Sequence, residues 1–180
     1  MLNDLAEAER VALLDDMQHQ LDLYCQGLSF EMGDTTDNGR KLTFSAEGDI
    51  DLFSRVSDLV EDAPDLDWWE FVAFKQPQGT DLRVIFDRCH FETHKMFFQL
   101  LSCDDCPDQM GLRVAFDRKA CCPPDTPDDD VMVGIYVTIE ALVGEFACAT
   151  LIGYLETCPL PKDPLHDGFR PLDDLPKFCQ

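Results

Sequence analysis

Between residues 28 and 116 the chain consists of short runs of β-branched, aromatic and other apolar residues separated by turn-forming residues. The first two runs alternate strictly between apolar and polar residues, which is typical of strands with one buried face. The six runs lie at residues 28–32, 42–47, 69–74, 82–86, 96–101 and 111–116. Their separators contain Gly, Pro, Asn and Asp, which favour tight turns between antiparallel strands. The pattern therefore predicts an antiparallel meander of six or seven strands.

Two other stretches have the periodicity of amphipathic helices. Apolar side chains recur at helical spacing over residues 2–26, which predicts an N-terminal amphipathic helix. Residues 49–63 show the same periodicity, and Pro64 marks the end of that helix because proline cannot continue it. Together with the strands, these helices predict an α+β fold in which the helices pack on one face of the sheet.

The apolar stretch at residues 131–143 fits either a strand or a helix. Its apolar residues match one helical face, the three aspartates at 128–130 suit the first turn of a helix, and Gly144 suits its end. We therefore favour a helix here. A last strand is expected within residues 147–157.

The size and composition of the chain predict one domain with its own core. A chain of 180 residues with 45% hydrophobic residues buries enough surface to fold without a metal or a disulfide. We assign residues 1–160 to a single α+β domain. The proline-rich residues 161–180 are expected to form an extended tail, and their apolar side chains indicate that it packs on the domain.

Acidity is the property of the composition that bears most on function. The chain has 36 Asp and Glu against 14 Lys and Arg, a formal net charge of −22. A surface this negative repels phosphate backbones and anionic lipid headgroups, so we expect no direct binding to nucleic acid or membranes. A basic protein is the partner that such a surface attracts.

The nine cysteines do not form a recognisable disulfide framework. Their number is odd, and the first residues lack the basic start and unbroken apolar run of a secretory signal. No apolar run is long enough to span a membrane. We therefore expect a cytoplasmic protein with free thiols and no cofactor. The adjacent pair Cys121 and Cys122 leaves a redox role open as an alternative.

Three sequence motifs occur in a recognisable order. An alanine followed by Glu47 and Gly48 ends the second run, Trp69 opens the sequence Trp-Glu-Phe-Val-Ala-Phe, and Gly144 precedes Glu145. In this order the motifs resemble the bacterial domain of unknown function 695 family, over residues 1 to about 160. The resemblance implies a fold but no activity, because that family has no established activity.

Catalytic motifs are sparse. The sequence contains no phosphate-binding loop, no glycine-rich dinucleotide fingerprint and no nucleophile elbow. Glu47, Glu70 and Glu145 lie in or near the three motifs, and carboxylates that converge in a pocket can act as acid and base. The alternative, which we favour, is that each is a solvated or backbone-bonded side chain. We therefore assign no catalytic residue.

Two histidines and two cysteines form a second candidate site. His90 and His94 are followed by Cys103 and Cys106, and the spacing within each pair suits zinc. The strand expected between the pairs would hold them about 20 Å apart, because a strand advances about 3.3 Å per residue. We therefore assign no metal. A small metal-binding protein or hydrolase that uses this cluster is the alternative function.

The leading functional hypothesis rests on residues 47–70, which we name the acidic segment. It contains nine acidic residues against one basic residue, Arg55, and it includes the pair Trp68-Trp69. Either one indole of this pair faces outward, or the second is covered by another element. We predict a non-catalytic interaction or regulatory protein, for example an immunity-type inhibitor of a basic partner. Its predicted partner-binding residues are Asp51, Asp58, Asp62, Asp65, Asp67, Trp68 and Trp69.

Overall fold

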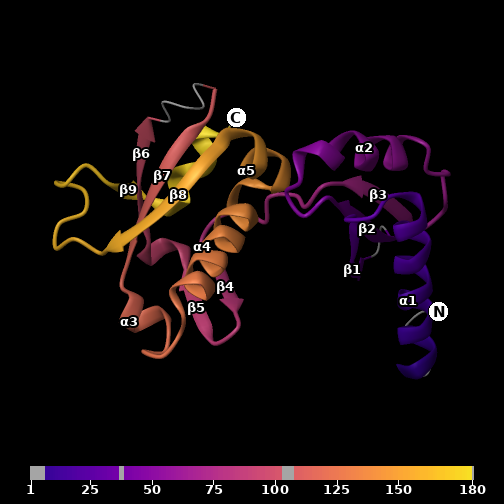
Figure 1. Cartoon of the computed structure of the whole chain (residues 1–180), viewed down its shortest axis with the longest axis horizontal. Helices are drawn as coiled ribbons and strands as arrows, with labels where there is room; N and C mark the ends of the chain where they lie inside the picture. The colour runs from indigo at the N-terminus through magenta and orange to yellow at the C-terminus, as the bar shows by residue number, and fades with distance from the viewer. Residues whose placement is uncertain (1–6, 37–38, 103–107, 180) are drawn as a thin grey trace. The chain divides into compact units, whose positions relative to one another are not determined.

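The computed structural model describes residues 7–36, 39–102 and 108–179, and the chain forms two compact units (Figure 1). Unit 1 is Met1–Lys75 and unit 2 is Gln76–Gln180, so the domain predicted over residues 1–160 spans both. The α+β class and the N-terminal helix are confirmed. Among the described residues the strands are divided among three sheets rather than joined in one meander, and two neighbouring pairs are parallel.

Unit 1 combines a three-stranded sheet with helices. Its described elements are α1 (Glu7–Tyr24), β1 (Ser29–Thr36), β2 (Gly39–Ser45), η2 (Ile50–Leu52), α2 (Phe53–Glu61) and β3 (Trp69–Ala73). The sheet order is β1-β2-β3, with β1 antiparallel to β2 and β2 parallel to β3. The antiparallel pairing predicted for the first two runs is confirmed as the β1–β2 hairpin. The predicted second helix is confirmed as η2 with α2, and it connects the two parallel strands.

The core of unit 1 is small. Helix α2 buries Phe53 and Val56, and the Phe53 ring packs on Phe74 with the ring centroids 4.6 Å apart. In α1 Leu21 is buried, whereas Leu23 is 69% exposed. Several apolar side chains in the described part of α1 therefore face solvent.

In its described residues, unit 2 contains a two-stranded hairpin, a four-stranded sheet, α-helices and 3-10 helices. Its described elements are β4 (Arg83–Phe86), β5 (Cys89–Glu92), η3 (Thr93–Lys95), β6 (Phe97–Ser102), β7 (Met110–Phe116), α3 (Arg118–Cys121), α4 (Asp128–Val143), α5 (Glu145–Leu151), β8 (Ile152–Pro159), β9 (Arg170–Pro171) and η4 (Leu172–Phe178). The order in the larger sheet is β8-β7-β6-β9. Strand β6 is antiparallel to β7 and β9, and β7 is parallel to β8. Helices α3, α4 and α5 connect β7 to β8. Neighbouring parallel strands need a crossover connection of this kind, with a dozen or more residues.

The helix favoured for residues 131–143 is confirmed as α4. The aspartates at 128–130 occupy its first turn, where negative charge is favourable. Gly144 follows its last residue with a φ of 84°, a conformation that glycine adopts without steric cost. The last strand begins only at Ile152, because the preceding residues form α5, which no sequence pattern indicated.

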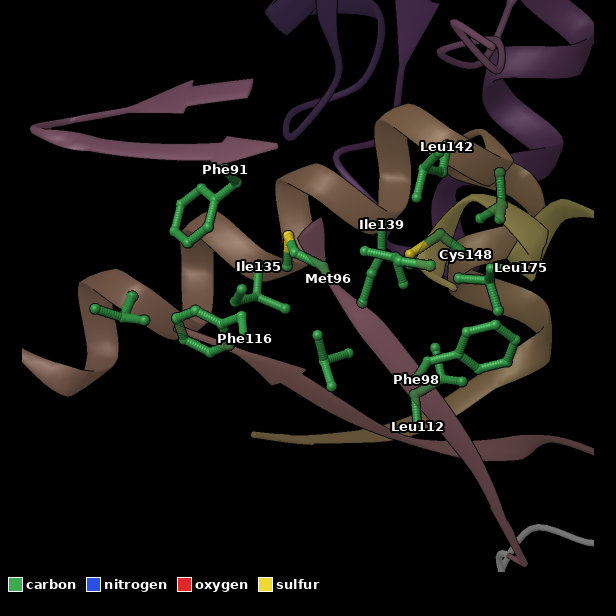
Figure 2. Close-up of a cluster of buried hydrophobic side chains, with 14 of the residues drawn as sticks. Phe91, Met96, Phe98, Leu112, Phe116, Ile135, Ile139, Leu142, Cys148 and Leu175 are labelled. Carbon is green, nitrogen blue, oxygen red and sulfur yellow. The ribbon is translucent and has the colours of Figure 1, made fainter. Parts of the chain in front are cut away.

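The main hydrophobic cluster lies wholly in unit 2 (Figure 2). Ile139 of α4 packs in it together with Phe98 of β6 and Leu112 of β7, and each is at most 1% exposed. Leu172 of η4 joins the same cluster, and its amide donates a hydrogen bond to the Met96 carbonyl (2.9 Å). The C-terminal segment is therefore part of the core of unit 2.

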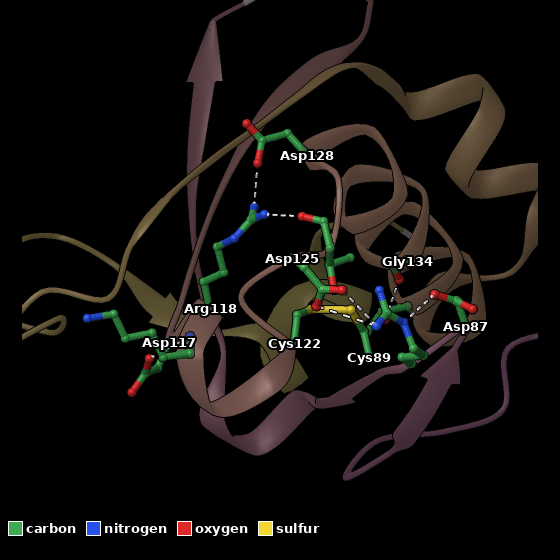
Figure 3. The surroundings of a disulfide bond; sticks show 12 residues. Asp87, Cys89, Asp117, Arg118, Cys122, Asp125, Asp128 and Gly134 are labelled. Carbon is green, nitrogen blue, oxygen red and sulfur yellow. Dashed lines mark hydrogen bonds and ion pairs between the residues drawn. A yellow bond between two sulfur atoms is a disulfide. The ribbon is translucent and has the colours of Figure 1, made fainter.

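Cys89 of β5 and Cys122, directly after α3, form a disulfide (Figure 3). Their Cα atoms are 4.4 Å apart, although the two residues are 33 positions apart in the sequence. The expectation of free thiols is wrong for this pair, because folding brings together two cysteines that no sequence spacing connects. The other cysteines in the described part of the chain are free: Cys25, Cys121, Cys148, Cys158 and Cys179.

Candidate functional site

Trp68 lies in a tight turn directly before β3. The Trp69 amide donates a hydrogen bond to the Leu66 carbonyl (3.1 Å), which closes the turn. Trp68 has a φ of 72°, a left-handed conformation that is rare for a large residue and costs about 1–3 kcal/mol. Trp68 is 69% exposed, whereas Trp69 is half-buried. Of the two arrangements predicted for the tryptophan pair, the outward one therefore applies to Trp68.

The Trp68 turn is held by the neighbouring strand β2. The Arg40 amide donates a hydrogen bond to the Trp68 carbonyl (2.9 Å). Gly39 has a φ of 113°, and a Cβ atom there would lie 2.7 Å from the Trp68 carbonyl oxygen. A side chain at Gly39 would therefore displace the turn. The local sequence marks Gly39 only as a hairpin residue, because its contact with Trp68 depends on the parallel pairing of β2 with β3.

The predicted aspartates of the acidic segment all lie on the surface of unit 1. They are Asp51 in η2, Asp58 in α2, and Asp62, Asp65 and Asp67 in the connection to β3. All five are exposed, and none forms an ion pair with another residue in the described part of the chain. Two apolar residues of the same segment are also exposed, Ile50 at 50% and Leu66 at 46%. The helical periodicity of residues 49–63 predicts an inward-facing Ile50, and this prediction is wrong, because Ile50 lies in the 3-10 turn η2 rather than in α2. No sequence pattern indicates the exposure of Leu66.

Glu47 and Gly48 form a tight turn after β2. Their φ angles are 50° and 81°, and a backbone hydrogen bond of 3.0 Å closes the turn. The Glu47 carboxylate accepts hydrogen bonds from the Ser29 hydroxyl and from the Lys75 ammonium (2.6 Å). Burial raises the pKa of this carboxyl, but the two hydrogen bonds and the charge of Lys75 outweigh burial and hold the pKa below its usual value. Glu47 is therefore a charged residue that stabilises a turn, and it is poorly suited to donate a proton near neutral pH.

The other two motif carboxylates lie in separate surroundings. Glu70 of unit 1 pairs with Lys41 on β2 (3.3 Å), and both side chains are more than half exposed. Glu145 belongs to unit 2, where it is the first residue of α5 and is fully buried. Within unit 1, Glu47 and Glu70 each contact their own lysine, so these two carboxylates do not form an acid–base pair.

The predicted Cys/His cluster is described only in part. His90 is exposed on β5, on the face opposite to the buried residues of that strand. His94 lies in η3, and its Nδ1 atom is 2.9 Å from a carboxylate oxygen of Asp81. Cys103 and Cys106 lie outside the described residues. Over residues 7–36, 39–102 and 108–179, no group of three or more His, Cys, Asp or Glu is arranged to hold a metal ion.

Over residues 7–36, 39–102 and 108–179, no single helix is long and apolar enough to cross a membrane. Helices α4 and α5 meet the length and composition requirement only when taken together, and they are bent by 114° relative to each other.

Comparison of the chain with protein-family models, with curated proteins and with solved structures found no match.

Proposed function

We propose that this chain is a non-catalytic cytoplasmic interaction or regulatory protein, which docks a basic protein partner through the acidic segment of unit 1. The observation that carries the proposal is Trp68, an indole presented to solvent from a left-handed turn. A backbone conformation that costs free energy persists only where surrounding contacts enforce it, and such positions concentrate at functional sites. Tryptophan is also among the residues most enriched at the energetic centres of protein interfaces.

The charge around Trp68 indicates the chemistry of the partner. Asp65 and Asp67 lie in the connection that leads into the Trp68 turn, and Asp58 and Asp62 lie at the end of α2. No ion pair within the described residues occupies these carboxylates, so basic side chains of a partner can pair with them without displacing existing contacts. Complementary charge of this kind gives fast, salt-sensitive association. A basic protein, such as a nuclease held inactive by an immunity-type inhibitor, fits this surface.

Membership of the domain of unknown function 695 family is proposed on the motif order. The φ angles of Gly48 (81°) and Gly144 (84°) are both in the left-handed region, so each of these motif positions favours glycine for a physical reason. The structural roles of the two glycines support the resemblance and add no activity to it.

The docking proposal is tested by affinity capture with the full chain from a lysate of its source organism at low salt. The variant Asp58→Lys with Asp62→Lys reverses two charges in the acidic segment. The control, Asp15→Lys with Asp16→Lys, makes the same change in net charge on exposed positions of α1 in the same unit. We expect the native chain and the control to retain a basic protein, and the first variant to lose it.

Both variants should stay folded, because exposed charges contribute less than about 1 kcal/mol each. Circular dichroism and thermal unfolding check this point. Salt at about 0.5 M should also release the partner, since it screens exposed charges. Failure to retain any basic protein, or equal retention by the two variants, contradicts the proposal.

A further inference from the structure

A pocket lies where β7 and β8 of unit 2 end. Its volume of about 570 Å³ is in the range of small-molecule sites. Its walls include Phe116, Arg118, Lys119, Cys158, Pro159 and Leu160. The first three residues end or follow β7, and the last three end or follow β8. The carboxyl ends of two neighbouring parallel strands therefore form the pocket.

The topology explains a pocket at this edge of the sheet. After β7 the chain enters α3, whereas after β8 it continues to β9, on the far side of β7 and β6. Connections that diverge from adjacent parallel strands leave a crevice outside the carboxyl ends, and α/β sheets commonly bind ligands there. The Leu160 amide donates a hydrogen bond to the Phe116 carbonyl (3.1 Å). The side of the pocket formed by the end of β7 is therefore hydrogen-bonded to the side formed by the end of β8.

Lys119 carries the available positive charge of this pocket. The neighbouring Arg118 is already engaged, because its guanidinium pairs with Asp128 (2.7 Å; Figure 3) and donates to the Thr126 carbonyl (2.7 Å). The Asp117 carboxylate accepts hydrogen bonds from two backbone amides of α3. Lys119 is exposed, and no ion-pair partner for it exists in the described part of the chain. In a chain with 36 acidic against 14 basic residues, an available cation beside a pocket favours a negatively charged ligand.

The opposite wall is mainly apolar. Pro159 and Leu160 supply carbon surface, and Leu160 is 37% exposed. Burial raises the pKa of the Cys158 thiol, although the charge of Arg113 partly offsets this effect. The thiol is therefore neutral at physiological pH, and Cys158 serves as a weakly polar contact rather than as a nucleophile.

We propose that this pocket binds a small organic anion with an apolar body, such as an aryl or alkyl carboxylate. The carboxylate pairs with Lys119, and the apolar body packs against Phe116, Cys158 and Leu160. This assignment concerns unit 2 alone and does not depend on the docking proposed for unit 1.

Cys158 provides a reporter for the test. The full chain is alkylated with iodoacetamide in the presence of sodium 4-phenylbutyrate, and peptide mapping by mass spectrometry follows each cysteine separately. Phenylbutyrate should slow the alkylation of Cys158 and leave that of Cys25, in unit 1, unchanged. Shifts of the Lys119 and Leu160 amide signals in two-dimensional NMR measure the same binding even where Cys158 reacts too slowly to follow.

Two control ligands and a matched pair of variants distinguish the contribution of charge from that of apolar contact. The neutral 4-phenylbutan-1-ol and the cationic 4-phenylbutylamine have the same apolar body and should bind at least about tenfold more weakly. Lys119→Glu should weaken phenylbutyrate by about tenfold or more, because it replaces attraction with repulsion. Arg83→Glu, an equal charge change on the exposed face of β4, should leave binding unchanged.

Protection of Cys158 by phenylbutyrate that Lys119→Glu removes and Arg83→Glu retains supports the proposal. No protection together with no amide shift overturns it. Equal binding of the acid, the alcohol and the amine also overturns it, since the pocket would then be an apolar crevice without preference for anions.

Discussion

Units 1 and 2 differ in charge and in core. Unit 1 has 18 acidic against 5 basic residues in a length of 75, whereas unit 2 has 18 against 9 in a length of 105. The main hydrophobic cluster and the disulfide lie wholly in unit 2. The exposed Trp68 and its left-handed turn lie in unit 1. We infer that unit 2 holds most of the stability of the chain and that unit 1 presents the recognition surface.

The proposed docking function offers a reason for two features of unit 1 that cost stability. A small unit with a small core has little stability to spare, and clustered like charges reduce it further. Unit 1 nevertheless keeps unpaired aspartates and a tryptophan in a conformation that costs free energy. The proposed binding of a partner of opposite charge would account for both features. Both tryptophans of the chain lie in unit 1, so indole fluorescence reports on that unit alone.

The largest expected effect is the loss of a core ring in unit 2. Phe98 is fully buried, and its ring packs edge-on against Phe178. Phe98→Ala leaves a cavity and should lower the free energy of unfolding of unit 2 by about 3–5 kcal/mol. Hydrogen exchange resolved by peptides should show lost protection in β6 and β7 and unchanged protection in β2 and α2. An equal loss of protection in both units would contradict the inferred difference in stability between them.

Reduction of the Cys89–Cys122 disulfide should have the next largest effect. The bond closes a loop of 33 residues in unit 2, and restraint of an unfolded loop of this length is worth about 3–4 kcal/mol. Thermal unfolding of the oxidised protein with and without dithiothreitol measures the loss, and tryptophan fluorescence should change less than circular dichroism. Cys121→Ser, which removes a neighbouring free thiol, should leave the effect of the reductant unchanged. Peptide mapping that finds Cys89 and Cys122 both alkylated without reduction would contradict this prediction.

Gly134→Ala should destabilise unit 2, although alanine normally stabilises a helix interior by up to about 1 kcal/mol relative to glycine. A Cβ atom at Gly134 would lie 2.4 Å from the Phe91 ring, so overpacking should cost about 1–3 kcal/mol. The control is Gly33→Ala in β1 of unit 1, where the nearest atom to a new Cβ is 3.5 Å away. Urea unfolding should show a loss for the first variant and none for the second. Equal stability of both variants and the native chain would contradict close packing between α4 and the β4–β5 hairpin.

The smallest effect concerns the pH dependence of unit 1. The pKa of Glu47 is lower in the folded chain than its ordinary value of 4.5, so the unfolded state binds more protons at acid pH. The stabilisation is therefore present above pH 4.5 and is lost as the pH falls through the lowered pKa of the folded state. Glu47→Gln should remove this part of the pH dependence, by less than about 1 kcal/mol because the side chain is half exposed.

Urea unfolding followed by tryptophan fluorescence at several pH values between about 3 and 7 measures the Glu47 effect. Ser29→Ala, which removes one hydrogen-bond donor to the carboxylate, should reduce the same pH dependence in part. A native chain and a Glu47→Gln variant with identical pH dependence would contradict the assignment.

Features that depend on neighbouring residues in the chain could be predicted from the sequence. Helix α4 followed from its apolar face with aspartates before it and Gly144 after it, and the β1–β2 hairpin followed from strict alternation. The exposure of the predicted aspartates followed from their charge alone, because an unpaired carboxylate is costly to bury.

Features that depend on which strands become neighbours could not be predicted. The Cys89–Cys122 disulfide joins β5 to the end of α3. The close approach of Gly39 to the Trp68 backbone depends on the parallel pairing of β2 with β3. The pocket near Lys119 likewise exists because β7 and β8 are parallel neighbours. The apolar pattern of residues 147–157 also hid α5, because a short buried helix and a short strand have similar apolar runs.

The most direct test of the recognition role of unit 1 compares two residues that are equally exposed. Trp68 and Leu23 are both 69% exposed in unit 1, and truncation of either to alanine changes no charge. Titration calorimetry of each variant with the captured basic partner gives the two dissociation constants. We expect Trp68→Ala to weaken binding by about 2 kcal/mol or more, about 30-fold, and Leu23→Ala to change it by less than about twofold. Unchanged affinity for Trp68→Ala, or an equal loss for both variants, would contradict the central role of Trp68.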